Sequence, residues 1–165
     1  MKKLITLGFG AAVVLLSSAP VAAQQTATAN VTATASVNAK AKLDVIGAVA
    51  FGDADPDLTP IIAATALNIS VKARTGANQA VTLTVQAGGD FTETGGGTIG
   101  ISNLTWLVTG GGFVAGTAAS ASAVSVGSWT NSGNQSGTQT YRLANSWAYA
   151  TGSYSVTLTY TLTAP

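Results

Sequence analysis

Hydrophobic and polar residues alternate without interruption near the end of the sequence, within residues 151–164. From Tyr154 to Leu162 every second residue is large and apolar, and the residues between them carry short hydroxyl side chains. Successive side chains of a β-strand point to opposite faces, so this period of two predicts a strand with one apolar face. Such a face needs a second apolar layer to cover it, which favours one sheet packed on another. We therefore expect residues 151–164 to form a central strand of the core.

The same period of two recurs along most of the chain. It predicts six further strands, at residues 40–51, 65–73, 80–87, 98–108, 123–129 and 138–143. Gly76 and Asn78 lie between the second and third of these and favour a turn, so we expect those two strands to pair as a hairpin. The apolar positions change parity between Ile101 and Leu104, which predicts a β-bulge. Residues 113–122 carry no clear pattern and receive no assignment.

Residues 24–39 alternate small apolar residues with threonine, asparagine and serine. One face would carry Ala27, Ala29, Val31, Ala33, Ala35 and Val37. Because these side chains are small, the strand would bury little apolar area, and its register would be weakly fixed. It is either an edge strand of its own domain or a donor strand that completes the sheet of a neighbouring subunit. With this segment included, about eight strands and no helix predict an all-β fold, an antiparallel β-sandwich.

The first residues have the layout of a secretory signal peptide. Two lysines give a positively charged start, an apolar run follows over residues 4–16, and small residues occupy positions 21–23. We expect cleavage after Ala23. A membrane anchor is the alternative, but the apolar run is shorter than the roughly 20 residues that cross a bilayer. The mature chain would then comprise residues 24–165, a single domain without a membrane span, secreted to the periplasm or the extracellular surface.

The composition argues against catalysis. Histidine and cysteine are absent, which removes the usual general base, the commonest metal ligand, thiol chemistry and disulfides. No Gly-x-Ser-x-Gly nucleophile motif occurs. After removal of the signal peptide, five basic and six acidic residues remain, a net charge of −1, and the sequence shows no basic patch. We therefore expect a non-enzymatic protein without a cofactor, and we do not expect nucleic acid as a partner.

Two groups of side chains are candidates for ligand binding. Asp53, Asp55 and Asp57 stand at alternate positions and could gather oxygens around Ca²⁺, but the glycine and the glutamate of an EF-hand loop are missing. A solvated acidic turn is the preferred interpretation, so no metal site is predicted. Trp147 and Tyr149 could offer aromatic faces to a sugar, whereas we expect the other two tryptophans to lie in the core.

Several segments resemble secreted spore coat U–type domains and the related archaic chaperone–usher pilins. The opening strand is rich in small residues (TANVTATASVNAKAKL), and a Phe-Gly turn with aspartate and proline follows it (FGDADPD). The next matching segment is LNISVKARTGANQAVTLTVQAG, and a Gly-x-Tyr precedes the threonine-rich last strand (GSYSVTLTYTL). The resemblance implies an immunoglobulin-like sandwich whose subunits join by donor-strand exchange, the N-terminal segment of one completing the next. The donor would fall within residues 26–37.

The leading hypothesis is a secreted, non-enzymatic structural protein of the cell surface. It would be a pilin-like or coat-like subunit that assembles by β-strand complementation with identical or related subunits, and a periplasmic chaperone is a further candidate partner. The alternative is a secreted carbohydrate-binding or adhesive sandwich module that acts as a monomer and uses Trp147 and Tyr149. In that case residues 24–39 would pair within their own domain.

Overall fold

The computed structural model describes residues 27–165, so the predicted signal peptide lies outside the described residues. Almost every regular element in this part is a β-strand, which confirms the prediction of an all-β fold. The strands number eleven rather than about eight, because the shortest ones carry too little pattern to be recognised. The strands are β1 (Lys40–Ile46), β2 (Ile61–Ala63), β3 (Leu67–Arg74), β4 (Ala80–Ala87), β5 (Phe91–Thr92), β6 (Thr98–Ile99), β7 (Leu104–Thr109), β8 (Gly116–Thr117), β9 (Val124–Thr130), β10 (Gly133–Ala144) and β11 (Leu158–Thr163).

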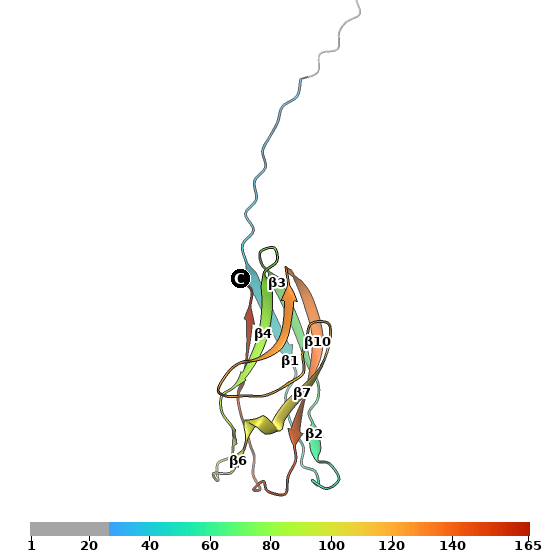
Figure 1. The fold of residues 1–165 in the computed structure, drawn as a ribbon, viewed down its shortest axis with the longest axis vertical. Helices are drawn as coiled ribbons and strands as arrows, with labels where there is room; N and C mark the ends of the chain where they lie inside the picture. The colour runs from blue at the N-terminus through green and yellow to red at the C-terminus, as the bar shows by residue number, and fades with distance from the viewer. Residues whose placement is uncertain (1–26) are drawn as a thin grey trace, which may run out of the picture. The chain divides into compact units, whose positions relative to one another are not determined.

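The strands form two main layers within the compact unit of residues 36–165 (Figure 1). One layer has the strand order β1-β3-β10-β7-β8, and β2 pairs with β10 as well. The other layer has the order β11-β4-β9, and β5 pairs with β6 as a separate ribbon. All of these pairings are antiparallel. β1 and β11 are thus the terminal strands of their layers.

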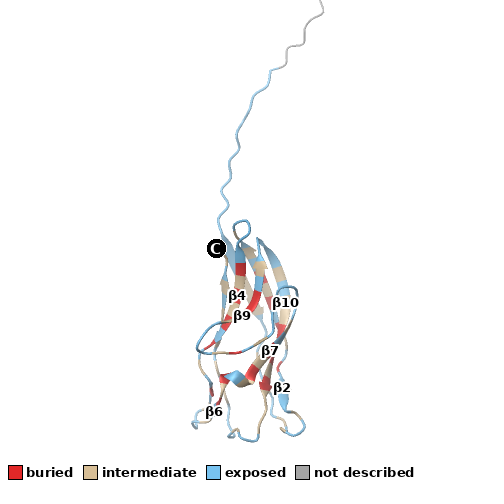
Figure 2. Ribbon diagram, in the orientation of Figure 1, coloured by how far each residue is buried: buried red, intermediate tan, exposed pale blue. Residues whose placement is uncertain are grey.

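Apolar side chains from both layers form one core. Figure 2 shows buried positions in red on strands of both layers. β3 and β4 each turn three alternate residues inward, none more than 4% exposed: Leu67, Ile69 and Val71, and Val81, Leu83 and Val85. Trp106 of β7 packs edge-on against Tyr141 of β10, with ring centroids 5.8 Å apart, and both are buried. The predicted core position is therefore confirmed for Trp106, while Trp129 is half-buried. The two apolar faces cover each other, as a sandwich requires.

The predicted hairpin between residues 65–73 and 80–87 is wrong. Both segments form strands, but β3 pairs with β1 and β10, whereas β4 pairs with β11 and β9. The turn at residues 75–79 therefore crosses from one layer to the other. Each strand has one apolar face, and the two faces bury each other across the core instead of lying side by side in one sheet.

The last strand is an edge strand, which contradicts the prediction of a central one. β11 pairs with β4 and has no second partner strand among residues 27–165. It is also shorter than predicted, because residues 151–157 contribute only an isolated bridge from Ser155 to Thr92. An alternating pattern reveals one apolar face of a strand, but it does not reveal how many neighbours that strand has.

Other differences from the prediction are local. The parity change within residues 98–108 is a 3-10 turn (Ile101–Asn103) between β6 and β7 rather than a bulge. β10 begins at Gly133, earlier than predicted, and the unassigned segment contains β8. The strand predicted over residues 40–51 ends at Ile46, where Gly47 adopts a φ of 129° that other residues rarely adopt.

Candidate strand-pairing edge

β11 offers an unpaired backbone edge at one side of the sandwich. Its six residues pair with residues 82–87 of β4, and within residues 27–165 no backbone hydrogen bond reaches its other edge. β1 likewise pairs only with β3. β1 and β11 approach each other along this side but belong to different sheets. A row of free N–H and C=O groups on an edge strand is a template for pairing with another strand.

The inward-facing side chains along this edge are largely apolar and incompletely covered. Leu158, Tyr160 and Leu162 of β11 contact the core and are only half-buried, and the same holds for Leu43 and Val45 of β1. Burial of apolar surface stabilises by roughly 25 cal/mol per Å². A strand added beside β11 would therefore gain stability by covering these side chains as well as by pairing its backbone.

The opposite edge of the same layer is covered. Residues 110–117 run beside β9, where the Val114 N–H donates to the Val126 carbonyl oxygen at 2.8 Å. The indole of Trp129 donates its Nε1 hydrogen to the carbonyl oxygen of Gly111, also at 2.8 Å. The fold thus protects the β9 edge with its own chain and leaves the β11 edge open.

A polar cluster closes the interior beneath the open edge. The Tyr160 hydroxyl donates to Gln139 Oε1 at 2.6 Å and lies 2.8 Å from the Tyr141 hydroxyl. Gln139 and Tyr141 belong to β10 and are fully buried, so Tyr160 reaches from one layer to the other. Burial raises the pKa of Tyr141 to about 12, and burial together with the neighbouring Tyr141 raises the pKa of Tyr160 as well. Both phenols therefore stay neutral near pH 7 and serve as a structural link between the layers.

Residues 27–39 form no strand, although they carry an alternating pattern. Every residue in this segment is exposed, including Val31 at 92% and Val37 at 69%. The predicted donor residues Ala27, Ala29, Val31, Ala33, Ala35 and Val37 are therefore all uncovered. The first strand of the compact unit, β1, begins after this segment, at Lys40.

The three aspartates of the predicted acidic turn are not arranged as a metal site. Asp55 Oδ1 accepts a hydrogen bond from the Asp57 N–H at 2.9 Å, and Asp57 Oδ1 accepts one from Trp147 Nε1 at 3.1 Å. No group of three or more acidic, histidine or cysteine side chains within residues 27–165 is placed to hold a metal ion. Asp53 is exposed in the same loop. These carboxylates order a solvated loop.

Trp147 and Tyr149 are placed differently from each other. Trp147 is 70% exposed, and its indole is held by Asp57. Tyr149 is half-buried against the core, and its hydroxyl donates to the Ala144 carbonyl oxygen at 3.1 Å. Of the two aromatic rings predicted to contact a sugar, only that of Trp147 is well exposed.

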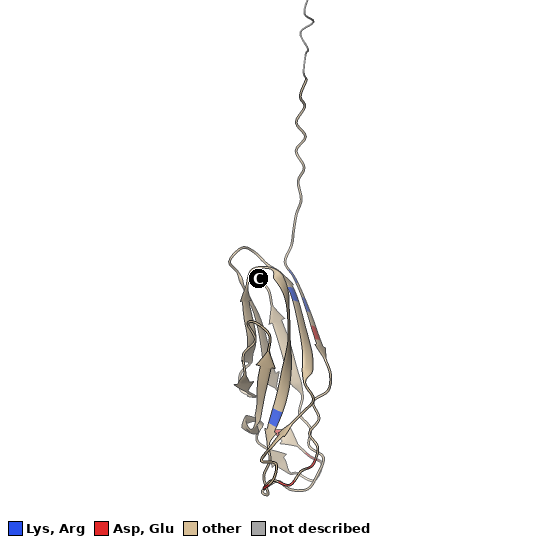
Figure 3. Ribbon diagram, turned by 90° about the vertical axis from the view of Figure 1, so that its right-hand side faces the viewer, with Lys and Arg blue, Asp and Glu red and all other residues tan. Residues whose placement is uncertain are grey.

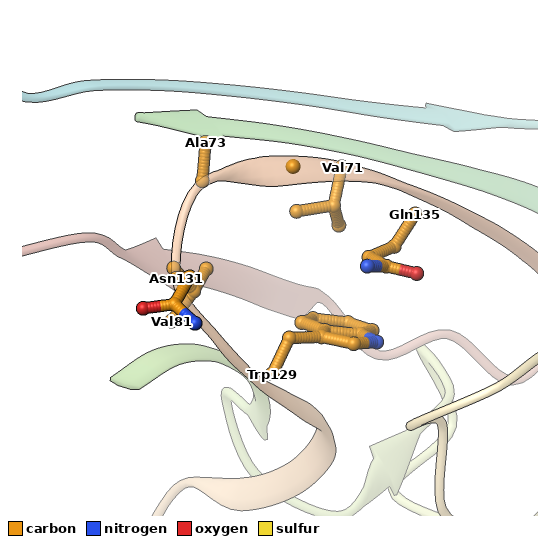
Figure 4. A pocket seen from close by; sticks show the side chains of 7 residues that line it. Val71, Ala73, Val81, Trp129, Asn131 and Gln135 are labelled. Carbon is orange, nitrogen blue, oxygen red and sulfur yellow. The ribbon is translucent and has the colours of Figure 1, made fainter. Parts of the chain in front are cut away.

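A cavity opens between the layers near the β3–β4 turn. Figure 4 shows Val71 and Gln135 on one side of it and the indole of Trp129 on the other. Its volume is about 10 Å³, which is room for one water molecule at most. This cavity is too small for a sugar.

Sequence reasoning missed a cluster of positive charge. The pairing of β1 with β3 places Lys40 opposite Arg74 and Lys42 opposite Lys72, and all four side chains are exposed. Figure 3 shows blue segments near one end of these neighbouring strands. The expectation that the chain has no basic patch is therefore wrong. The sequence shows that Lys40 and Lys42 share one face of a strand, and that Lys72 and Arg74 do so as well. It does not show that these two strands are neighbours.

Comparison of the chain with protein-family models, with curated proteins and with solved structures finds no match. The interpretation of the open edge therefore rests on its geometry and on the sequence motifs. Within residues 27–165, no helix is both long enough and apolar enough to cross a membrane.

Proposed function

We propose that this protein is a secreted, non-enzymatic structural subunit of the cell surface that assembles by β-strand complementation. The β11 edge of one copy would accept residues 27–39 of another copy as an added strand. The resemblance to spore coat U–type domains and archaic chaperone–usher pilins supports this assignment. The signal-peptide pattern of residues 1–23 supports export.

One observation carries the proposal: within residues 27–165, neither the apolar edge of β11 nor the strand-patterned segment 27–39 has a partner strand. An added strand would extend the layer β11-β4-β9 by one position. The small side chains of residues 27–39 suit this edge, because Tyr160 and its hydrogen-bonded partners already fill the interior beneath it. Such a strand needs only to cover half-buried side chains, not to fill a deep pocket.

The segment is better placed to pair with a second copy than with its own β11. It leads directly into β1 through SVNAK (residues 36–40). A return onto its own β11 would require the chain to reverse within these residues. Pairing with a neighbouring copy requires no reversal.

Deletion of residues 24–37 tests the proposal. We expect the exported chain of residues 24–165 to form large species that dissociate on heating. The deletion variant should remain a monomer with an unchanged β-rich circular dichroism spectrum, because the core lies within residues 40–165. Size-exclusion chromatography with light scattering, before and after heating, measures the mass of each species.

A variant that replaces residues 24–37 with a glycine–serine segment of equal length serves as the matched control. It keeps the length of the segment but loses the alternating apolar face, so it should also remain monomeric. Large species that persist in the deletion variant, or a monomer for the unaltered chain, would contradict the proposal.

A further inference from the structure

The sandwich has two ends with different chemistry. We call the end that carries residues 75–79, between β3 and β4, the turn end, and the end that carries residues 47–60, between β1 and β2, the loop end. β1 begins at the turn end and β3 finishes there. The basic cluster of Lys40, Lys42, Lys72 and Arg74 thus lies at the turn end. It contains four of the five basic residues within residues 27–165.

The loop end carries three of the six acidic residues within residues 27–165. Asp53, Asp55 and Asp57 are exposed in the segment between β1 and β2, which we call the acidic loop. Exposed apolar side chains accompany them, since Leu58 is 82% exposed and Trp147 is 70% exposed beside Asp57. Figure 3 shows the red segments of this end apart from the blue segments near the start of β1. Tryptophan is enriched at protein interfaces, so an exposed one is a candidate contact residue.

Three of the four basic side chains in the cluster have no ion-pair partner within residues 27–165. Like charges directly opposite each other on neighbouring strands are destabilising, and the β1–β3 register contains two such pairs. The single ion pair within residues 27–165 joins Lys42 to Asp44 at 3.1 Å. Only 8% of the residues in this chain are charged, so four basic residues at one end are a concentrated surface that fits an anionic partner.

We propose that the basic cluster of one copy docks on the acidic loop of the next copy, so that charge aligns the subunits end to end. This inference rests on the proposed strand complementation. Every pairing in the two layers is antiparallel, and β11 runs from the loop end to the turn end. A donor segment antiparallel to β11 therefore finishes at the loop end of the acceptor, where the donor's own Lys40 follows. That geometry brings the basic cluster of the donor to the acidic loop of the acceptor.

Charge reversal in matched pairs tests this docking. The basic-end variant combines Lys72→Glu with Arg74→Glu, and the acidic-loop variant combines Asp55→Lys with Asp57→Lys. We expect each variant of the exported chain to assemble roughly tenfold more slowly than the unaltered chain at low ionic strength. Lys40 and Lys42 stay in place, so the basic-end variant leaves the cluster without net charge. The variant with all four substitutions keeps the original net charge and lets the new carboxylates of one copy pair with the new ammonium groups of the next, so it should recover part of the rate. Light scattering over time, at low and at high salt, measures assembly.

Ser125→Glu is the control, because Ser125 is exposed on β9, which contributes to neither the basic cluster nor the acidic loop. It should leave the assembly rate within about twofold. Circular dichroism of each variant checks that the exposed substitutions leave the fold intact.

The outcomes separate this inference from the proposed function. An unaltered chain that does not assemble overturns both. Charge-reversed variants that assemble at the unaltered rate, or a fourfold variant that does not recover, overturn the docking and leave strand complementation standing. Retention on heparin that the basic-end variant loses, with an unchanged assembly rate, also overturns it and assigns the cluster to a polyanion. Slow paired variants with recovery in the fourfold variant support it.

Discussion

Tyr160 connects the open edge to the core. Its backbone belongs to the edge strand β11, while its hydroxyl reaches two buried side chains of β10 in the other layer. Gln139 depends on this contact, because its Nε2 atom is buried without a partner in the described structure and its Oε1 atom is held by Tyr160. A buried polar group that loses its last partner bears its full desolvation cost.

Tyr160→Phe tests how much this contact contributes to the free energy of unfolding. The substitution keeps the ring but leaves Gln139 Oε1 unpaired, so the free energy of unfolding should fall by about 1–3 kcal/mol. Tyr154→Phe is the matched control, because the Tyr154 hydroxyl donates to the Ala150 carbonyl oxygen at an exposed position. Its effect should stay below about 0.5 kcal/mol. Urea unfolding of the monomeric deletion variant, with and without each substitution, measures both values, and equal losses would contradict the assigned role.

The same cluster predicts how stability depends on pH. Burial raises the pKa of Tyr141 from 10 to about 12 and also raises the pKa of Tyr160. The folded state therefore holds these protons more tightly than the unfolded state does. The resulting stability is fully present below pH 10 and is lost as the pH rises from there through the folded-state pKa values. Tyr160→Phe removes one of the two groups. The urea concentration at the unfolding midpoint should therefore fall less steeply with pH above pH 10 in this variant than in the unaltered chain, and an equal slope would contradict this.

At the scale of elements, the two edge strands of the layer β11-β4-β9 differ in how they are covered. β11 is open, whereas residues 110–117 cover β9 and fit closely around Trp129. Gly112 permits that fit, because its φ is 82° and a Cβ there would lie 2.2 Å from Trp129 Nε1. Within this layer, protection of the β9 edge limits strand addition to β11.

Gly112→Ala should weaken this protection. Strain at positive φ and the clash with Trp129 together should lower the free energy of unfolding by about 2–4 kcal/mol. Gly111→Ala is the matched control, because no atom lies within 4 Å of its added Cβ and its φ is not positive. Chemical unfolding compares the two variants. Light scattering of the deletion variant carrying Gly112→Ala should also reveal new association through the uncovered β9 edge, and equal behaviour of the two variants would contradict this account.

The sequence predicts strands well and their partners poorly. Residues 80–87 form a strand with the predicted bounds, because their alternation is strict and turns flank them. The predicted pairing of β3 with β4 is wrong because a strand with one apolar face can lie beside another such strand or face it across the core. The edge position of β11 and the basic cluster were missed for the same reason. Both depend on which strands become neighbours, and periodicity within one strand does not contain that information.

At the scale of the whole molecule, the domain is closed before any strand is added. Leu83, Leu104 and Val126 are 0% exposed within the described subunit, so the centre of the core is fully covered without a partner subunit. The inward side chains of β1 and β11 are among those that remain half-covered. Strand addition therefore stabilises an already folded domain, and its contribution should follow mass action.

Thermal unfolding at several protein concentrations tests this relation. A subunit that binds only the folded form stabilises it by RT ln(1 + [L]/Kd), about 2.7 kcal/mol when the free subunit is present at about 100 times Kd. The unfolding temperature of residues 24–165 should therefore rise with concentration, while that of the variant lacking residues 24–37 should stay constant. Scanning calorimetry over a wide concentration range measures both. A deletion variant that is unfolded at every concentration would show that the added strand completes the core, whereas a constant temperature for both chains would show that no strand is exchanged.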